Sequence, residues 1–288
     1  MSITIAASML EAAQILRKAG ISEGRREAGS LLEQVINCDR TFIIGHPEHE
    51  ITAEQLHCFR QCVARRAKGE PLQYITGRQA FFGLDFEVTK DVLIPRPETE
   101  LLVETALSLI DDAEPAPFIC DVGTGSGCMA IALLHERPGA HAVAIDVSEA
   151  AIRVAQRNAA RHAVSERIAF VASDCLSAIK EDKPRFDLVV SNPPYVAASA
   201  LAGLQREVRD HEPRVALAAG PDGLLIIQRL LAESGAFLEV GGYLLLEIGF
   251  DQGVSVGGLI ARNGWKLLDI HQDLQGIPRI VALQKIAS

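Results

Sequence analysis

The chain has 288 residues, of which 48% are hydrophobic and 23% charged, so it can bury a sizeable core. Its formal net charge is −9 at pH 7, and the first 75 residues carry nine basic and nine acidic side chains, so the whole acidic excess lies after them. This balance argues against a general DNA-binding surface. No run of about 18 apolar residues occurs, and the N-terminus lacks a signal-peptide pattern. We therefore expect no membrane span and a cytoplasmic location.

Six cysteines are scattered along the chain without a Cys-x-x-Cys pair. Neither a zinc site nor a redox pair is therefore expected, and we predict no metal. Cys58 and Cys62 are one helical turn apart, and we expect both to be buried thiols. This usage fits a reducing compartment.

The first 75 residues are predicted to form a small helical bundle. Apolar residues recur at helical spacing from Ile5 to Leu16 and again from Ala28 to Val35. Residues 52–55 have the form of a capping box, which would start a further helix. The bundle holds no glycine loop and no catalytic cluster, so we expect it to dock a protein substrate. The alternative is that it braces the connector that follows it.

A basic patch of Arg65, Arg66 and Lys68 lies near the end of that last helix. The favoured interpretation is a solvated helix face. The alternative interpretation is a contact with ribosomal or tRNA-like phosphate.

Residues 76–96 are expected to form a hairpin connector, because Phe81 to Val88 alternates apolar and polar side chains and includes aromatic ones. The third part, residues 97–288, would be the catalytic domain. At its start Pro97 can occupy the first position of a helix, with acidic residues in the first turn. Arg96 lies between two prolines and is thus presented rigidly, which makes it a candidate site residue.

From residue 118 onward strands and helices alternate, which predicts an α/β sheet with right-handed connections. Strands are expected at 118–122, 141–145, 168–171, 186–191, 243–248, 265–270 and 279–283. The last two would be antiparallel neighbours. Residues 201–223 show few strand signals and are expected to be a substrate loop.

A glycine loop, Gly123-Thr124-Gly125-Ser126-Gly127, joins the first of these strands to a helical run that starts at Cys128. Strand, glycine loop and helix open the nucleotide-binding half of a doubly wound sheet. Glycine lets the backbone approach a ligand closely. The spacing is G-x-G-x-G, which differs from the G-x-G-x-x-G of dinucleotide enzymes.

Two carboxylates follow the next two strands. Asp146 ends the strand at 141–145, where it can accept both hydroxyls of a ribose. Asp174 follows the strand at 168–171, where it can accept from an adenine amine. Together with the glycine loop they predict a pocket for S-adenosylmethionine.

The tetrapeptide Asn192-Pro193-Pro194-Tyr195 follows the strand at 186–191. The prolines fix φ and lack N–H donors, so the carbonyls there are held in place and free to accept. The Asn192 amide adds an acceptor oxygen, and Tyr195 offers a flat face. Such a turn can hold a planar –NH2 group by both its hydrogens, which methylation of an amide or of an exocyclic base amine requires. A plain proline-rich turn is the alternative.

These motifs resemble, in order, those of the bacterial peptide chain release factor glutamine methyltransferase family (PrmC, also called HemK), and the resemblance spans nearly the whole chain. The segments that carry it are Gln73–Gly77, Ile94–Glu100, Asp121–Gly127, Ser191–Tyr195 and Leu246–Gly249. The resemblance implies a Rossmann-like class I S-adenosylmethionine methyltransferase sheet with a small N-terminal helical bundle. It also implies methyl transfer to the glutamine side-chain amide in the Gly-Gly-Gln motif of peptide release factors.

The resemblance further implies roles for individual residues. Gly123 to Gly127 would line the methionine part of the cofactor, and Asp146 would bind its ribose. Asn192 would contact both cofactor and substrate, and Pro193 to Tyr195 would complete the glutamine pocket. Some members have Trp beside the adenine, after the aspartate that corresponds to Asp174, where this chain has Cys175.

Other functions stay open at this point. An adenine amino-methylase acting on DNA would use the same turn, although it must also flip its base out of the duplex. A ribosomal-protein glutamine methyltransferase is another alternative, although the run from Arg96 to Glu100 resembles the release-factor enzymes more than these sister enzymes. An NAD-dependent oxidoreductase and a non-catalytic module that binds S-adenosylmethionine are further alternatives.

Overall fold

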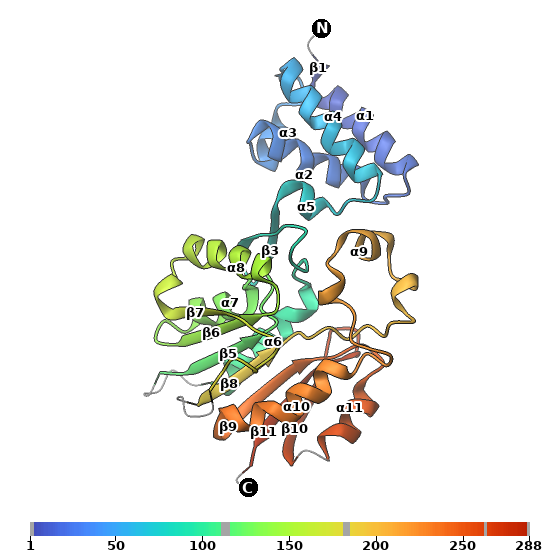
Figure 1. Cartoon of the computed structure of the whole chain (residues 1–288). Helices are drawn as coiled ribbons and strands as arrows, with labels where there is room; N and C mark the ends of the chain where they lie inside the picture. The colour runs from blue at the N-terminus through green and yellow to red at the C-terminus, as the bar shows by residue number, and fades with distance from the viewer. Residues whose placement is uncertain (1–2, 111–115, 181–184, 262–263, 287–288) are drawn as a thin grey trace. The chain divides into compact units, whose positions relative to one another are not determined.

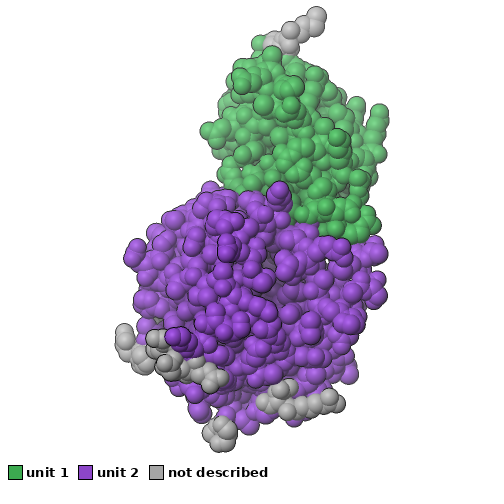
Figure 2. All heavy atoms as spheres, in the orientation of Figure 1, with its two compact units in different colours: residues 1–78, 205–211 green, residues 79–204, 212–288 purple. Residues whose placement is uncertain are grey.

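The computed structural model describes residues 3–110, 116–180, 185–261 and 264–286. The chain forms two compact units (Figure 2). Unit 1 comprises residues 1–78 and 205–211, and unit 2 comprises residues 79–204 and 212–288. None of the helices in the described ranges is long and apolar enough to cross a membrane.

Unit 1 is mostly helical, as the sequence predicts (Figure 1). Its helices are α1 (Ile5–Lys18), α2 (Gly24–Ile36), α3 (Arg40–Gly45), α4 (Ala53–Ala67), α5 (Leu72–Thr76) and α9 (Arg206–His211). The short strands β1 (Ile3–Thr4) and β2 (Glu50–Ile51) pair antiparallel. The predicted capping box is present: Gln55 N donates to Thr52 Oγ1 at 3.1 Å, and Thr52 N donates to Gln55 Oε1 at 2.9 Å.

Arg66 corrects the prediction of a solvated basic patch, because its side chain is only 4% exposed. It follows Phe59 and Val63 along the face of α4 that packs into the bundle. Its guanidinium is paired there with the carboxylates of Glu27 and Glu207. Arg65, on the outer face, is paired with Glu70.

The orientation of α4 also corrects the prediction that Cys58 and Cys62 are buried thiols. Cys58 is exposed and Cys62 is partly exposed. Since α4 turns Phe59 and Val63 into the core, the neighbouring position 58 faces outward. In the described ranges no group of His, Cys, Asp and Glu side chains could hold a metal ion.

The predicted hairpin is formed by β3 (Arg78–Phe81) and β4 (Leu84–Glu87). Its two-residue turn has positive φ at both Phe82 (49°) and Gly83 (73°), as a type I′ turn requires. The side chains of Phe81 and Phe86 are buried in the core of unit 2. Their ring centroids lie 6.1 Å apart in an edge-to-face arrangement.

Unit 2 is built on a seven-stranded sheet, counted over the described residues, with the order β10-β11-β9-β8-β5-β6-β7. The strands are β5 (Phe118–Val122), β6 (His141–Asp146), β7 (Ile168–Ala172), β8 (Phe186–Ser191), β9 (Leu238–Glu247), β10 (Trp265–Gln272) and β11 (Pro278–Lys285). The five from β9 to β7 are parallel, and β11 runs antiparallel to both β9 and β10. The prediction that the last two strands are antiparallel neighbours is confirmed.

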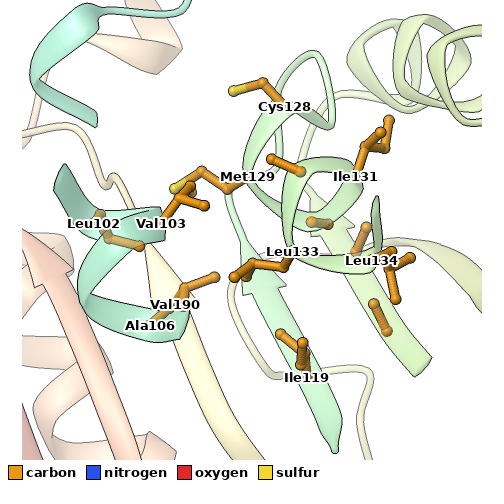
Figure 3. Close-up of a cluster of buried hydrophobic side chains, with 14 of the residues drawn as sticks. Leu102, Val103, Ala106, Ile119, Cys128, Met129, Ile131, Leu133, Leu134 and Val190 are labelled. Carbon is orange, nitrogen blue, oxygen red and sulfur yellow. The ribbon is translucent and has the colours of Figure 1, made fainter. Parts of the chain in front are cut away.

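Both faces of the sheet are covered, which explains why its strands are apolar runs. Leu188 and Val190 of β8 join one buried cluster, whereas Val189 between them joins the other. The first cluster includes side chains of α6 (Glu100–Leu109) and α7 (Cys128–Glu136), and part of it is shown in Figure 3. The second cluster includes side chains of α10 (Leu225–Phe237) and α11 (Gly253–Ile260). A further helix of unit 2, α8, spans Glu149–Arg161.

The strand order places a topological switch point at β5, which has β6 on one side and β8 on the other. In open α/β sheets, ligands bind outside the carboxyl ends of the strands at such a point. The glycine loop follows β5, the Asn-Pro-Pro-Tyr turn follows β8, and Asp146 is the last residue of β6.

Candidate active site

A cavity of about 540 Å³ opens at the carboxyl ends of these strands, within the size range of small-molecule sites. It lies wholly within unit 2. Its lining brings together most of the residues singled out from the sequence: Gly123, Thr124, Gly125, Ser126, Asp146, Asp174, Cys175, Asn192, Pro193, Pro194 and Arg96. Gly127 and Tyr195 do not line it.

The glycines of the loop differ in their surroundings. Gly123 (φ +77°) has open space where a Cβ would stand, and Gly125 (φ +56°) meets only a carbonyl at 4.0 Å. Gly127 is crowded instead, because a Cβ there would lie 2.9 Å from Ile131 Cδ1 and 3.1 Å from Ala155 Cβ. The first two glycines thus keep room for a ligand, and the third lets α7 pack closely against α8.

Asp146 holds this loop from the end of β6. Its Oδ2 accepts from Gly125 N at 2.9 Å, and its Oδ1 accepts from Ser148 N at 2.8 Å. Burial raises the pKa of Asp146, and these backbone donors oppose that rise. Each carboxylate oxygen has further acceptor capacity, so the group can also receive hydroxyl donors from a ligand.

Asp174 and Cys175 line the cavity in different ways. The Asp174 side chain is 64% exposed and forms an ion pair with Arg229 at 2.7 Å. Cys175 is buried, with a left-handed backbone (φ 49°), and burial raises the pKa of its thiol to about 11. Cys175 is therefore a neutral, apolar part of the wall.

The Asn-Pro-Pro-Tyr turn is anchored at both ends. Ser191 Oγ donates to Val122 O at 2.6 Å, which joins the turn to the end of β5. Gln252 Nε2 donates to the carbonyls of Tyr195 and Gly223, both at 3.1 Å. The turn therefore presents Asn192 to the cavity from a fixed backbone.

Tyr195 is placed behind the turn. Its ring packs against the apolar cluster of β8, β9 and α10. Burial raises the pKa of its phenol to about 12, so it stays protonated. The flat face predicted for the pocket is directed into the core instead of lining the cavity.

Family comparisons agree with this arrangement. The PrmC N-terminal domain family matches residues 9–77, and the methyltransferase small domain family matches residues 98–209. A release factor glutamine methyltransferase from Koribacter versatilis (strain Ellin345) is 42% identical over 273 residues, or 95% of each chain. One from Geobacter sulfurreducens is 41% identical over 266 residues, covering 92% of this chain and 91% of the relative. The chain belongs to the release factor glutamine methyltransferase family.

Solved structures show that this family member has a Rossmann-like class I methyltransferase fold. A methyltransferase from Pyrococcus furiosus matches with a TM-score of 0.53 at 19% identity, covering 79% of this chain and 98% of that one. The hMettl16 catalytic domain, in complex with an RNA hairpin, matches with a TM-score of 0.57 at 17% identity, covering 79% and 82%. At such identities the likeness concerns the fold alone.

Three buried polar residues of this methyltransferase were not singled out individually from the sequence: Thr99, Asp121 and Glu247. Asp121 is fully buried beneath the glycine loop, where Thr124 Oγ1 donates to its Oδ2 at 2.7 Å. Burial raises its pKa to about 7. In the sequence, Asp121 and Glu247 could have been noticed as acidic residues within apolar strands. A carboxylate buried there needs hydrogen-bond partners or has a function.

Arg96, a candidate from the sequence, lines the cavity and is paired with Glu212. Its Nη2 lies 2.5 Å from Glu212 Oε1, and the Glu212 side chain is 1% exposed. A buried carboxylate therefore fixes the guanidinium at the cavity wall.

Proposed function

We propose that this chain transfers a methyl group from S-adenosylmethionine to the side-chain amide nitrogen of glutamine in the Gly-Gly-Gln motif of peptide chain release factors. One observation carries the proposal: a single cavity joins an open glycine loop to the Asn192-Pro193 turn. Membership of the family supports the substrate.

The residues of the cavity fit S-adenosylmethionine. Gly123 and Gly125 leave space that any Cβ would fill. In this proposal Gly123 to Ser126 hold the methionine part, and Asp146 accepts from the ribose hydroxyls. Asp174 and Cys175 border the adenine, and Gly127 contributes through packing. When bound, the cofactor supplies a methyl group on a sulfonium, which is an excellent leaving group.

Asn192 and Pro193 would orient the glutamine amide. The Oδ1 atom of Asn192 and the carbonyl of Pro193 would accept its two N–H groups, so that the nitrogen faces the methyl group. Positive charge develops on that nitrogen as the N–C bond forms and the S–C bond breaks, and fixed acceptors stabilise it. The extra proton then leaves to water, so the proposal needs no histidine or cysteine base.

Pro194 and Tyr195 would support this pocket in different ways. Pro194 lines the cavity and restricts the turn. Tyr195 packs behind it and keeps the turn in place.

Unit 1 would supply docking area for the release factor. A folded protein substrate needs more contact than one glutamine provides. Leu10 is 63% exposed and Ile44 is 68% exposed on this unit. We expect Leu10→Lys and Ile44→Lys to raise KM for an intact factor and to leave KM for a short Gly-Gly-Gln peptide unchanged.

The decisive experiment is to incubate the full chain with labelled S-adenosylmethionine and a purified release factor, and to locate the label by mass spectrometry. We expect one methyl group on the glutamine of the Gly-Gly-Gln motif. A factor in which this glutamine is replaced by alanine is the control. Label on DNA or on a ribosomal protein, with none on the factor, would overturn the proposal.

A further inference from the structure

Asn192 is the first member of a chain of three hydrogen-bonded side chains. Its Nδ2 donates to Thr99 Oγ1 at 3.0 Å, and Thr99 Oγ1 donates to Glu247 Oε2 at 2.7 Å. The three residues come from different parts of the fold: Asn192 directly follows β8, Thr99 ends the 3-10 turn Pro97–Thr99, and Glu247 is the last residue of β9. Thr99 and Glu247 are 2% and 1% exposed, so the bond between them is shielded from water, whereas Asn192 is partly exposed at the cavity.

The hydroxyl and amide protons that are available decide which group donates in each of these two hydrogen bonds. When Glu247 is ionised its carboxylate only accepts, so Thr99 gives its single hydroxyl proton to Glu247. The hydroxyl oxygen then serves as the acceptor for Asn192, and only the Nδ2 end of the amide can donate to it. The Oδ1 end therefore points away from Thr99, and no described residue donates to it.

We propose that Thr99 and Glu247 are positioning residues, which set the amide of Asn192 so that its oxygen faces the glutamine to be methylated. This inference rests on the proposed function. A reversed amide would offer N–H groups to the substrate N–H groups, and the two would repel each other. The motifs at Ile94–Glu100 and Leu246–Gly249 thereby acquire a shared role.

The surroundings of Glu247 make its charge sensitive to pH. Burial raises the pKa of Glu247 to about 7, against hydrogen bonds from Thr99 and Tyr195 and the charge of Arg279 on β11, while Glu98 adds to the rise. Cys128 of α7 also lies within its electrostatic reach. A protonated Glu247 becomes a donor, so Thr99 is free to donate to Asn192 Oδ1 and the amide is no longer fixed.

The test uses full-length variants that differ by single atoms. Thr99→Val keeps the shape and removes the hydroxyl, whereas Thr99→Ser keeps the hydroxyl. The matched control is Thr105→Val, because Thr105 is also buried and its hydroxyl donates to Leu101 O at 2.8 Å within α6. We expect Thr99→Val to lower kcat on the release factor about 10- to 100-fold, as small misplacements at a reacting atom do. KM and the Kd for S-adenosylmethionine should stay unchanged.

Two further measurements separate positioning from mere support of the fold. The kcat of the unsubstituted protein should fall as pH drops below about 7, and Glu247→Gln should have a lower kcat that no longer follows pH in this range. Carbon-13 NMR of the Glu247 carboxyl group should show its pKa rising in Thr99→Val and unchanged in Thr105→Val.

The outcomes test the positioning role of Thr99 and Glu247 separately from the proposed function. Recovery of kcat in Thr99→Ser, with the pH and NMR results above, supports the positioning role. Should Thr99→Val not fold, the pH profile of Glu247→Gln decides alone. A Thr99→Val protein as active as Thr105→Val, beside an active unsubstituted protein, would overturn the positioning role only. Failure of the unsubstituted protein to methylate any release factor would overturn the proposed function.

Discussion

Arg66 donates from Nη2 to Glu207 Oε1 at 2.6 Å, although 141 positions separate the two residues in the sequence. The same guanidinium donates from Nε to Glu27 Oε2 at 2.5 Å. Glu207 belongs to a segment, residues 205–211, that is part of unit 1 while its neighbours in the chain are part of unit 2. A buried cation on α4 thus holds a segment that follows the Asn-Pro-Pro-Tyr turn in the sequence.

Replacing Arg66 should destabilise unit 1 strongly. Arg66→Met keeps much of the volume but leaves the Glu27 carboxylate, whose side chain is 15% exposed, without its partner. Breaking a buried pair in this way costs about 3–5 kcal/mol. Glu207→Gln should cost less than about 1 kcal/mol, because the Glu207 side chain is 40% exposed. Hydrogen exchange of the backbone amides of α2 and α4 measures the loss of stability in each variant. Equal losses in Arg66→Met and Glu207→Gln would contradict this prediction.

The sequence predicted the parts of the fold that depend on local pattern. The capping box at Thr52, the hairpin at Phe81 and the glycine loop at Gly123 each depend on neighbours within a few residues. The pairing of Arg66 was mispredicted because its partner Glu207 is far along the chain. The link between Asn192 and Glu247 was missed for the same reason, since only the sheet order places the end of β9 beside that of β8.

Asn192→Ala should cut methyl transfer to the release factor by about 10²–10³, the usual loss when one fixed acceptor is removed where charge develops. Binding of S-adenosylmethionine should weaken less than turnover. Single-turnover rates and calorimetry on the same preparation provide both numbers. Near-normal turnover would show that another group holds the glutamine.

Asp146→Asn should chiefly weaken binding of S-adenosylmethionine. Charge-assisted hydrogen bonds contribute roughly 1.5–3 kcal/mol each, so Kd should rise about 10- to 100-fold. Asp174→Asn should have a smaller effect, because the Asp174 carboxylate is 64% exposed and already paired with Arg229. Calorimetry of both variants tests the order, and a larger rise for Asp174→Asn would reverse the assignment of ribose and adenine ends.

Glu247→Gln should alter how stability depends on pH. The pKa of Glu247 is raised from 4.5 to about 7 in the fold, so its contribution to stability is fully present below about 4.5 and is lost as pH rises through about 7. Between about pH 5 and 8.5 the unsubstituted protein should therefore lose roughly 2–3 kcal/mol relative to the variant. The single tryptophan, Trp265 on β10, reports unfolding of unit 2. A difference that grows with pH in the opposite sense would contradict the raised pKa.

Gly223→Ala should damage both stability and turnover, because Gly223 packs against the turn that carries Asn192. A Cβ at Gly223 would clash with the carbonyl oxygen of Tyr195 and lie 2.9 Å from Gln252 Nε2. The matched control is Gly241→Ala: φ is +87° at Gly241 and +77° at Gly223, but no atom lies within 4 Å of a Cβ at Gly241.

Comparing Gly223→Ala with Gly241→Ala separates the cost of a left-handed backbone from the cost of the steric clash with the Tyr195 carbonyl. Gly241→Ala should cost about 1–3 kcal/mol, as a left-handed backbone does for residues with a Cβ, and leave kcat unchanged. Gly223→Ala adds displacement of the Tyr195 carbonyl, which Gln252 now holds in place, so the turn and Asn192 must shift with it. We expect a larger loss of stability and at least about a 10-fold loss of kcat. Equal kcat values in the two variants would show that the turn tolerates the shift and that Asn192 keeps its position without this support.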